Sequence, residues 1–276
     1  MLDADFVKSH GLGNDYIVVD AAHFGIALTP ERVRLLCHRH LGLGSDGVLE
    51  ISATDDRFSV KIWNPDGSEA ERSGNGLRIA AKFLSEHGYT IEQSFTIETA
   101  AGPVKTEVYR DAGRVVAVRL EMGRAVIDRG VKTLDVPGYR LDVSVVSVGN
   151  PHCVVFGQPQ TRDSLLAIGP LVENHARFPA RINVQLAAPD SRDRVRALVW
   201  ERGAGHTLAS GTSACAVAAV CYDRGLVDGK VTVVMEGGQL EVEVAKDLAI
   251  IMTGPVEEVF VGSLSPDMRR RLVEVQ

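Results

Sequence analysis

The order of apolar and polar residues along the chain predicts a fold of many short strands and a few helices. Runs in which apolar and polar residues alternate, or in which β-branched residues are frequent, are typical of strands. In the first half, such runs predict strands at 16–20, 47–51, 58–63, 94–99, 104–109 and 115–122. In the second half, they predict strands at 141–148, 152–156, 182–187, 194–200, 230–235, 240–244 and 248–252.

Each half also contains one helix that is apolar on nearly all sides. The segments GLRIAAKFL at 76–84 and SACAVAAVC at 213–221 are typical of a helix buried within its own domain. Shorter amphipathic helices are predicted at 29–40, where Thr29 can serve as the cap, and at 161–175. The pattern therefore predicts an α/β (α+β) fold in which a mostly antiparallel sheet wraps around a central helix in each half.

The two halves resemble each other as sequences. Trp63 lies ten residues before Ser73, and Trp200 lies ten residues before Ser210, so the tryptophans and the serines repeat at one common offset. Three further pairs share an offset that is shorter by a single position: Gly13 and Gly149, Asn14 and Asn150, and Gly102 and Gly238. An offset that is nearly constant over so long a span indicates an internal repeat.

The repeat predicts two domains related by a pseudo-twofold axis, with the active site in the cleft between them. We expect domain one to comprise residues 1–114 plus 262–276, and domain two to comprise residues 115–261. The segment EEVFVG at 257–262 has no counterpart in the repeat and can return to the first half.

Composition excludes several classes of protein. A chain of 276 residues with 45% apolar content can form one large core or two ordinary ones. The net charge of −6 offers no electrostatic footprint for nucleic acid or an acidic membrane surface. Polar residues interrupt the first 20 positions, and no apolar run approaches the roughly 18 residues of a membrane span. We therefore expect a cytoplasmic protein.

Neither the cysteines nor the glycine-rich loop predicts a special site. Four cysteines without CxxC spacing favour buried, reduced thiols over a disulfide framework or a zinc site. The stretch GLGSDG at 42–47 matches a dinucleotide-binding pattern, but it follows a predicted helix and enters a strand, so we interpret it as an ordinary loop.

Ser73 and Ser210 each stand where a central helix begins. Serine is a preferred N-cap, so a purely structural role is one interpretation. Alternatively, the backbone N–H groups of Gly74 and Asn75, and those of Gly211 and Thr212, can bind an anion. Two helix ends facing one cleft could hold a substrate carboxylate, with one side chain on each side of its α-carbon.

The segments HGLGNDY, NPDGSEAERSGNG, GNPHCVV, INV and WERGAGHTLASGTSACA occur in this order over nearly the full chain. They resemble the signature segments of the diaminopimelate epimerase family. The resemblance implies two similar domains, an active site between them, no cofactor and no metal. It also implies inversion of an amino-acid α-carbon, because one group removes the α-proton and a second group returns a proton on the other face.

The sequence departs from the family at the chemistry. The resemblance places a catalytic cysteine pair at the positions that Ser73 and Ser210 occupy here. Serine is a far weaker base than a cysteine thiolate until another group activates it. His206 stands where the family pattern has glutamate, and its imidazole could take a proton from a nearby hydroxyl. A solvated loop histidine is the alternative interpretation.

Other polar positions match the family's substrate-binding residues. By resemblance these are Asn14, Asn64, Asn150, Asn183, Glu201 and Arg202. Arg202 suits bidentate capture of a distal carboxylate, Glu201 suits an ammonium group, and His152 is a supporting residue. From the residues alone, an asparagine in GND, WNPDG or GNPH is more often a turn residue, but the recurrence at a single offset favours a site.

The sequence leaves several functions open. We expect an isomerase that converts LL- to meso-diaminopimelate without pyridoxal phosphate, with its cysteines replaced by engineering or by natural divergence. A racemase of another amino acid that uses activated serines and an amino-acid-binding protein without turnover are the alternatives, and Gly47 makes a changed specificity an option. The expected partner is a small-molecule amino acid, with neither nucleic acid nor membrane involved, and a homodimer is compatible with this expectation.

Overall fold

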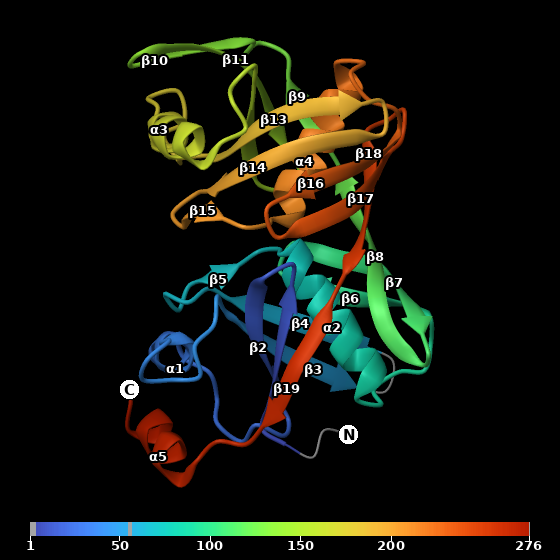
Figure 1. Cartoon of the computed structure of the whole chain (residues 1–276). Helices are drawn as coiled ribbons and strands as arrows, with labels where there is room; N and C mark the ends of the chain where they lie inside the picture. The colour runs from blue at the N-terminus through green and yellow to red at the C-terminus, as the bar shows by residue number, and fades with distance from the viewer. Residues whose placement is uncertain (1–3, 55–56, 276) are drawn as a thin grey trace. The chain divides into compact units, whose positions relative to one another are not determined.

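The computed structural model describes residues 4–54 and 57–275 and divides into two compact units. Unit 1 contains residues 1–120 and 254–276, and unit 2 contains residues 121–253. Figure 1 shows the elements of both units. Within the described ranges, no helix is both long and apolar enough to cross a membrane.

Within the described residues, unit 1 is built from eight complete strands, three helices and the larger part of β8. In chain order these are β1 (Phe6–Gly11), β2 (Asn14–Asp20), α1 (Pro30–Cys37), β3 (Val48–Thr54), β4 (Arg57–Trp63), β5 (Glu69–Ala70), α2 (Gly74–Glu86), β6 (Ser94–Thr99), β7 (Gly102–Asp111), β8 (Arg114–Arg124), β19 (Glu257–Gly262) and α5 (Pro266–Glu274), of which β8 runs on into unit 2.

Unit 2 repeats the central part of this order. Its elements are β9 (Val126–Asp128), β10 (Thr133–Val136), β11 (Tyr139–Ser147), β12 (Pro151–Phe156), α3 (Arg162–Glu173), β13 (Asn183–Ser191), β14 (Arg194–Glu201), β15 (Gly205–Thr207), α4 (Gly211–Asp223), β16 (Lys230–Met235), β17 (Gly238–Val244) and β18 (Ala249–Pro255), whose last residues belong to unit 1.

The strand pairing confirms the repeat. In unit 1, β2 pairs in parallel with β3 across α1, and β4 pairs in parallel with β6 across α2. In unit 2, β12 and β13 are parallel across α3, and β14 and β16 are parallel across α4. The remaining pairs described in each unit are antiparallel, as a parallel pair needs a crossover connection.

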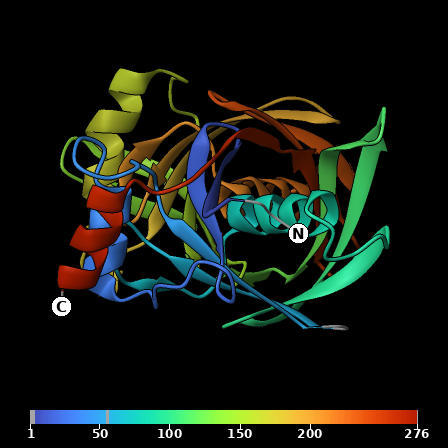
Figure 2. The same cartoon turned by 90° about the horizontal axis from the view of Figure 1, so that it is seen from below.

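The two apolar helices form the centres of their units, as predicted. Every residue from Gly74 to Leu84 in α2 and from Gly211 to Cys221 in α4 is buried. Strands β1, β2, β3, β4 and β7 pack on α2, and strands β11, β12, β13, β14, β16 and β17 pack on α4. Figure 2 shows α2 nearly side-on. All four cysteines are buried, also as predicted.

The limits of the units differ from the predicted boundaries of 114/115 and 261/262. Strand β19 pairs antiparallel with β1, from Phe6 opposite Gly262 to His10 opposite Glu257. Residues 254–261 therefore lie in unit 1 rather than in the second domain. Helix α5 follows and packs beside α1, where Arg32 Nε donates to the Leu272 carbonyl at 2.7 Å (Figures 1 and 2).

Candidate active site

The central helix of unit 1 begins at a serine that caps it. The Oγ of Ser73 accepts a hydrogen bond from the Gly76 N–H at 3.0 Å. The first intrahelical bond runs from Leu77 N to the Ser73 carbonyl at 2.9 Å. The N–H groups of Gly74 and Asn75 therefore precede the hydrogen-bonded turns, at the positive end of the helix, where an anion binds most readily.

A phenol lies beside this serine. Tyr16 is a buried residue of β2, and its Oη is 3.3 Å from Ser73 Oγ. Either hydroxyl can donate this hydrogen bond. Ser73 itself is only partly buried.

A chain of amides connects the helix end to a buried arginine. Asn14 Oδ1 accepts from Asn75 Nδ2 at 3.0 Å, and Asn75 Oδ1 accepts from Arg78 Nη2 at 2.9 Å. The Arg78 guanidinium is fully buried, at 0% exposure, and also donates to the carbonyls of Gly74 and Pro255. These bonds fix which way both asparagine amides point.

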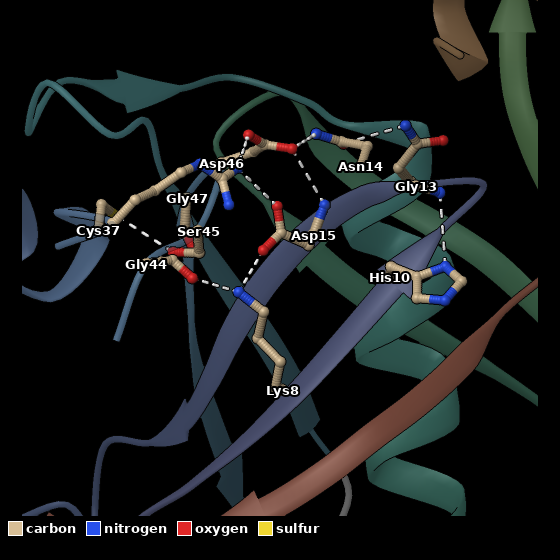
Figure 3. A network of polar contacts seen from close by, with 12 residues as sticks. Lys8, His10, Gly13, Asn14, Asp15, Cys37, Gly44, Ser45, Asp46 and Gly47 are labelled. Carbon is tan, nitrogen blue, oxygen red and sulfur yellow. Dashed lines mark hydrogen bonds and ion pairs between the residues drawn. The ribbon is translucent and has the colours of Figure 1, made fainter. Parts of the chain in front are cut away.

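Charged residues hold the other side of Asn14, as Figure 3 shows. Asn14 Nδ2 donates to Asp46 Oδ2 at 3.0 Å, and the Asp15 N–H donates to the same oxygen at 3.1 Å. Arg39 bridges the two carboxylates, at 3.0 Å from Asp15 and 2.7 Å from Asp46. Lys8 forms an ion pair with Asp15. Asn14 is thus held between a charged cluster and the start of α2.

The two carboxyl groups of this cluster differ in their pKa. Burial raises the pKa of Asp46, and its hydrogen-bonded neighbour Asp15 raises it further. Burial also acts to raise the pKa of Asp15, but the hydrogen bonds from Lys8 and Arg39 outweigh it and lower that pKa overall. Asp46 is therefore the carboxyl of the pair that takes up a proton first.

Asn64 lies in a turn. Its carbonyl accepts from Gly67 N at 3.0 Å, and its Nδ2 donates to Ser68 Oγ at 3.0 Å. Asn64 therefore makes the contacts of a turn residue, and its role in substrate binding stays a prediction.

The central helix of unit 2 also begins at a serine, with longer contacts. Ser210 is the N-cap of α4 and is 4% exposed. Its Oγ lies 3.5 Å from both Thr212 Oγ1 and the Ser213 N–H. The N–H groups of Gly211 and Thr212 precede the first bond of the helix, from Ala214 N to the Ser210 carbonyl at 3.0 Å. This helix end has the same backbone arrangement as the start of α2.

A neutral network supports this second helix end. His152 Nε2 is 2.8 Å from Asn150 Oδ1, and His152 Nδ1 is 3.0 Å from Gln185 Nε2. Gln185 Nε2 also donates to Ser213 Oγ at 2.9 Å. Burial of the imidazole lowers the pKa of His152 to about 3, and the positive charge of Arg202 acts in the same direction. His152 is therefore a neutral side chain that is hydrogen-bonded to Asn150, and its supporting role toward a ligand stays a prediction.

The loop with Glu201 and Arg202 is attached to the turn at 150–152. Asn183 Oδ1 accepts from the Arg202 N–H at 3.0 Å, and Asn183 Nδ2 donates to the Pro151 carbonyl at 2.8 Å. Asn183 thus fixes the backbone on which two predicted binding residues stand. The Arg202 side chain points along an exposed surface, with Nη1 3.4 Å from the Ala180 carbonyl.

The buried carboxylate of Glu173 fixes the other end of the same loop. Its Oε1 accepts from the Gly203 N–H at 2.8 Å, and its Oε2 accepts from Trp200 Nε1 at 2.7 Å. The backbone on both sides of Arg202 is therefore held by side-chain hydrogen bonds.

His206 is not the solvated loop histidine that was one of two interpretations. It lies in β15, its side chain is 10% exposed, and its Nε2 is 2.5 Å from Glu236 Oε2. The turn that carries Glu236 is bound to the same segment, because Gly237 N donates to the Leu208 carbonyl at 2.8 Å. The imidazole is therefore paired with a carboxylate, and the idea that it relays protons from Ser210 stays a prediction.

Sequence analysis missed Tyr16, Asp46, Gln185, Glu173 and Glu236. The repeat contained a signal for the first of these, because Tyr16 and His152 are separated by the same offset as Asn14 and Asn150. The other four are isolated polar residues in strands, loops or helix ends, and their contacts come from distant parts of the chain. Among the residues that the structure describes, no three His, Cys, Asp or Glu side chains are grouped to hold a metal ion, and the metal-free site stays an expectation.

The fold is shared with solved racemases and epimerases. A probable proline racemase from Agrobacterium radiobacter has a TM-score of 0.73 at 19% identity, covering 95% of this chain and 93% of its own. A predicted epimerase from Pseudomonas aeruginosa has a TM-score of 0.71 at 20% identity, covering 95% of this chain and 99% of its own. At these identities the likeness describes the fold alone.

Sequence comparison identifies the family. Residues 6–127 and 144–259 match the family model described as diaminopimelate epimerase. Diaminopimelate epimerase 2 from a Nostoc species is 39% identical over 281 residues, covering 95% of this chain and 96% of its own. Diaminopimelate epimerase from Moorella thermoacetica is 40% identical over 277 residues, covering 95% and 99%. The chain belongs to the diaminopimelate epimerase family.

Proposed function

We propose that the protein is an amino-acid epimerase of the diaminopimelate type, which inverts an α-carbon without pyridoxal phosphate. The proposed reaction converts LL- to meso-diaminopimelate in the cytoplasm, as a step in lysine and peptidoglycan biosynthesis. One observation carries the proposal: each unit of the family fold starts its buried central helix at a serine, beside an asparagine whose amide is fixed by hydrogen bonds.

The substrate carboxylate is proposed to accept hydrogen bonds from the N–H groups at both helix ends. Removal of the α-proton leaves extra negative charge on that carboxylate, and preorganised donors at a helix N-terminus stabilise such charge. Gly74 and Asn75 supply the donors of α2, and Gly211 and Thr212 supply those of α4. The fixed amides of Asn14 and Asn150 would orient the same substrate.

The distal part of the substrate is assigned to the loop after β14. Arg202 has the fork of donors that suits a carboxylate, and Glu201 suits an ammonium group. Supporting this assignment, Asn183 and Glu173 hold the backbone on both sides of Arg202, so its side chain starts from a fixed point. Asn64 is assigned to substrate binding by the family pattern.

The proton transfers are assigned to Ser73 and Ser210. One hydroxyl loses its proton to water, and the resulting alkoxide takes the α-proton from one face of the carbon. The other hydroxyl gives its proton to the opposite face of the carbanion. The alkoxide is scarce at neutral pH, so the rate is expected to be low and to rise with pH, whereas a thiolate, with a reference pKa of about 8.5, would saturate.

The test is α-proton exchange in deuterated water. Purified protein is incubated with diaminopimelate, and then with a panel of amino acids, and deuterium uptake is read by mass spectrometry. We expect uptake at one α-carbon, and its loss in Ser73→Ala and in Ser210→Ala. Deuterium uptake into another amino acid, and not into diaminopimelate, would show that the enzyme acts on that other amino acid. No uptake, with diaminopimelate still bound in calorimetry, would identify a binding protein without turnover and refute the proposed reaction.

A further inference from the structure

The repeat assigns equivalent positions to Tyr16 and His152. Each lies on the strand that runs in parallel to the next strand of its unit. His152 pairs with Asn183, and Gly47, the residue just before β3, is separated from Asn183 by the same offset as Tyr16 from His152. In unit 2, His152 is hydrogen-bonded to Asn150, and Asn183 accepts from the Arg202 N–H. In unit 1 the equivalent pair places an aromatic ring and its hydroxyl directly beside the N-cap serine.

The ring of Tyr16 fits because residue 47 has no side chain. A Cβ atom added at Gly47 would lie 2.7 Å from Tyr16 Cε1 and 2.4 Å from the Trp63 carbonyl oxygen. Real side chains do not make contacts this short, and the backbone of Trp63 is held in the sheet by its pairing with Val48. A larger residue at position 47 would therefore force both the Tyr16 ring and the Trp63 backbone to shift.

The hydroxyl of Tyr16 completes the hydrogen bonds around Ser73 Oγ. A serine oxygen has two lone pairs and one hydrogen. The Gly76 N–H occupies one lone pair at 3.0 Å, and Tyr16 Oη lies at 3.3 Å, where it can donate to the other. When Ser73 Oγ carries negative charge, both bonds become charge-assisted and therefore stronger, and the helix N-terminus adds a favourable field.

We propose that Tyr16 is a positioning residue for Ser73, which stabilises negative charge on Ser73 Oγ by donating a hydrogen bond to it, and that Gly47 admits the ring that makes this bond. Tyr16 keeps its proton throughout, so the proton balance of the proposed reaction is unchanged. The inference deepens the proposed function, because it rests on the assignment of proton transfer to Ser73.

The first test measures charge stabilisation without turnover. In the Ser73→Cys variant, the pH dependence of alkylation by iodoacetamide gives the pKa of the thiol introduced at position 73, and peptide mass spectrometry separates it from the four buried native cysteines. Adding Tyr16→Phe removes one donor to the thiolate. We expect the pKa of that thiol to rise by about one unit, which is about 1.4 kcal/mol.

Two controls accompany this measurement. Tyr139→Phe in the Ser73→Cys background removes an exposed phenol of unit 2 and should leave the pKa unchanged. Tyr16→Phe in a Ser210→Cys background should likewise leave the alkylation of position 210 unchanged. An equal pKa with and without the Tyr16 hydroxyl, in variants that unfold at the same urea concentration, overturns the inference.

The second test uses deuterium exchange by the protein with both serines in place. Tyr16→Phe should lower the exchange rate about tenfold, and Tyr139→Phe should not lower it. Ser73 takes the α-proton from one of the two substrate isomers. For that isomer, the isotope effect of α-deuteration on the exchange rate should be larger in Tyr16→Phe than in the parent protein. A merely structural loss would slow both substrate isomers without changing either isotope effect.

The two tests separate the inference from the proposed function. A raised thiol pKa in a protein that exchanges no α-proton supports the role of Tyr16 beside Ser73 and refutes the reaction. Exchange by the parent protein, together with an unchanged thiol pKa and an unchanged exchange rate in Tyr16→Phe, supports the reaction and refutes the role of Tyr16.

Discussion

The starts of α2 and α4 have the same backbone geometry but different polar surroundings. Ser73 Oγ accepts a hydrogen bond from a backbone N–H and shares one with a phenol, and the nearby Asn75 is anchored by a buried, charged Arg78. Ser210 is more buried, its contacts are 3.5 Å long, and the network behind it contains the neutral His152. The comparison teaches that the repeat preserves the scaffold of the two helix ends, while the side chains that tune each serine have diverged.

The largest predicted effect comes from removing the buried charge of Arg78 at the start of α2. Arg78→Met removes a guanidinium that donates to Asn75 Oδ1 and to the carbonyls of Gly74 and Pro255, and the first two of these bonds are buried. Hydrogen bonds to charged groups and unsatisfied acceptors each count for about 1–3 kcal/mol, so the free energy of unfolding should fall by about 3 kcal/mol or more. Urea denaturation measures it, with the exposed Arg140→Met as the matched control. A loss below about 1 kcal/mol would contradict the anchoring role of Arg78.

The next prediction makes the two helix ends chemically alike. Ser73→Cys combined with Ser210→Cys supplies two ionisable groups at helix N-termini, where thiol pKa values are readily lowered. The α-proton exchange rate should rise about 100-fold, equivalent to about 2.7 kcal/mol of barrier, and should level off with pH. The single Ser73→Cys variant is the control, because one thiol leaves the opposite face to a hydroxyl. No gain, with diaminopimelate still bound, would favour another substrate or binding without turnover.

A third prediction concerns the stability of the protein in acid, which should depend on His152 of unit 2. The pKa of His152 is about 3 in the folded protein against a reference value near 6.5, so the unfolded state binds more protons between these pH values. The free energy of unfolding therefore falls as the pH falls from about 6.5 towards 3, by up to about 1.4 kcal/mol per pH unit from this residue. His152→Gln should flatten that slope in urea denaturation, and the exposed His40→Gln should not. An unchanged slope in His152→Gln would mean that the imidazole titrates while folded.

The smallest predicted effect tests the imidazole nearest in sequence to Ser210. Because His206 is paired with Glu236, His206→Ala should change the exchange rate by less than about threefold. Glu236→Gln is the matched variant, since it weakens the same pair without touching the histidine. A loss of more than tenfold in His206→Ala alone would restore the proton relay that the sequence suggested.

The sequence predicted the repeated scaffold well, because the scaffold depends on local patterns. Uninterrupted apolar residues identify α4 as a buried helix, and Thr29 is the observed cap of α1. The helix α2 was predicted as apolar, yet it buries Arg78 and Lys82. Lys82 pairs with Glu86 in the same helix, but both side chains also donate to carbonyls distant in sequence, those of Pro255 and Val115. No local pattern encodes such partners.

The same limit applies to the candidate site. The N-cap serines follow from local signals, and their cap bonds are present. The contact between Tyr16 and Ser73 joins residues 57 apart, and the one between His152 and Gln185 joins residues 33 apart. Asn183 holds two backbone groups where the family pattern suggested a ligand contact, since an amide side chain can serve either purpose and spacing alone does not distinguish them.

The return of β19 and α5 to unit 1 has a consequence for biogenesis. During synthesis, unit 2 is one continuous stretch and can complete its core as soon as residue 253 has left the ribosome. Unit 1 is made first, but β1 waits for β19, and the cluster with Phe6 and Ile17 waits for Met268 and Leu272. The part of the protein that emerges first is thus the last to close, and until then the edge of β1 is open to chaperones or to mispairing.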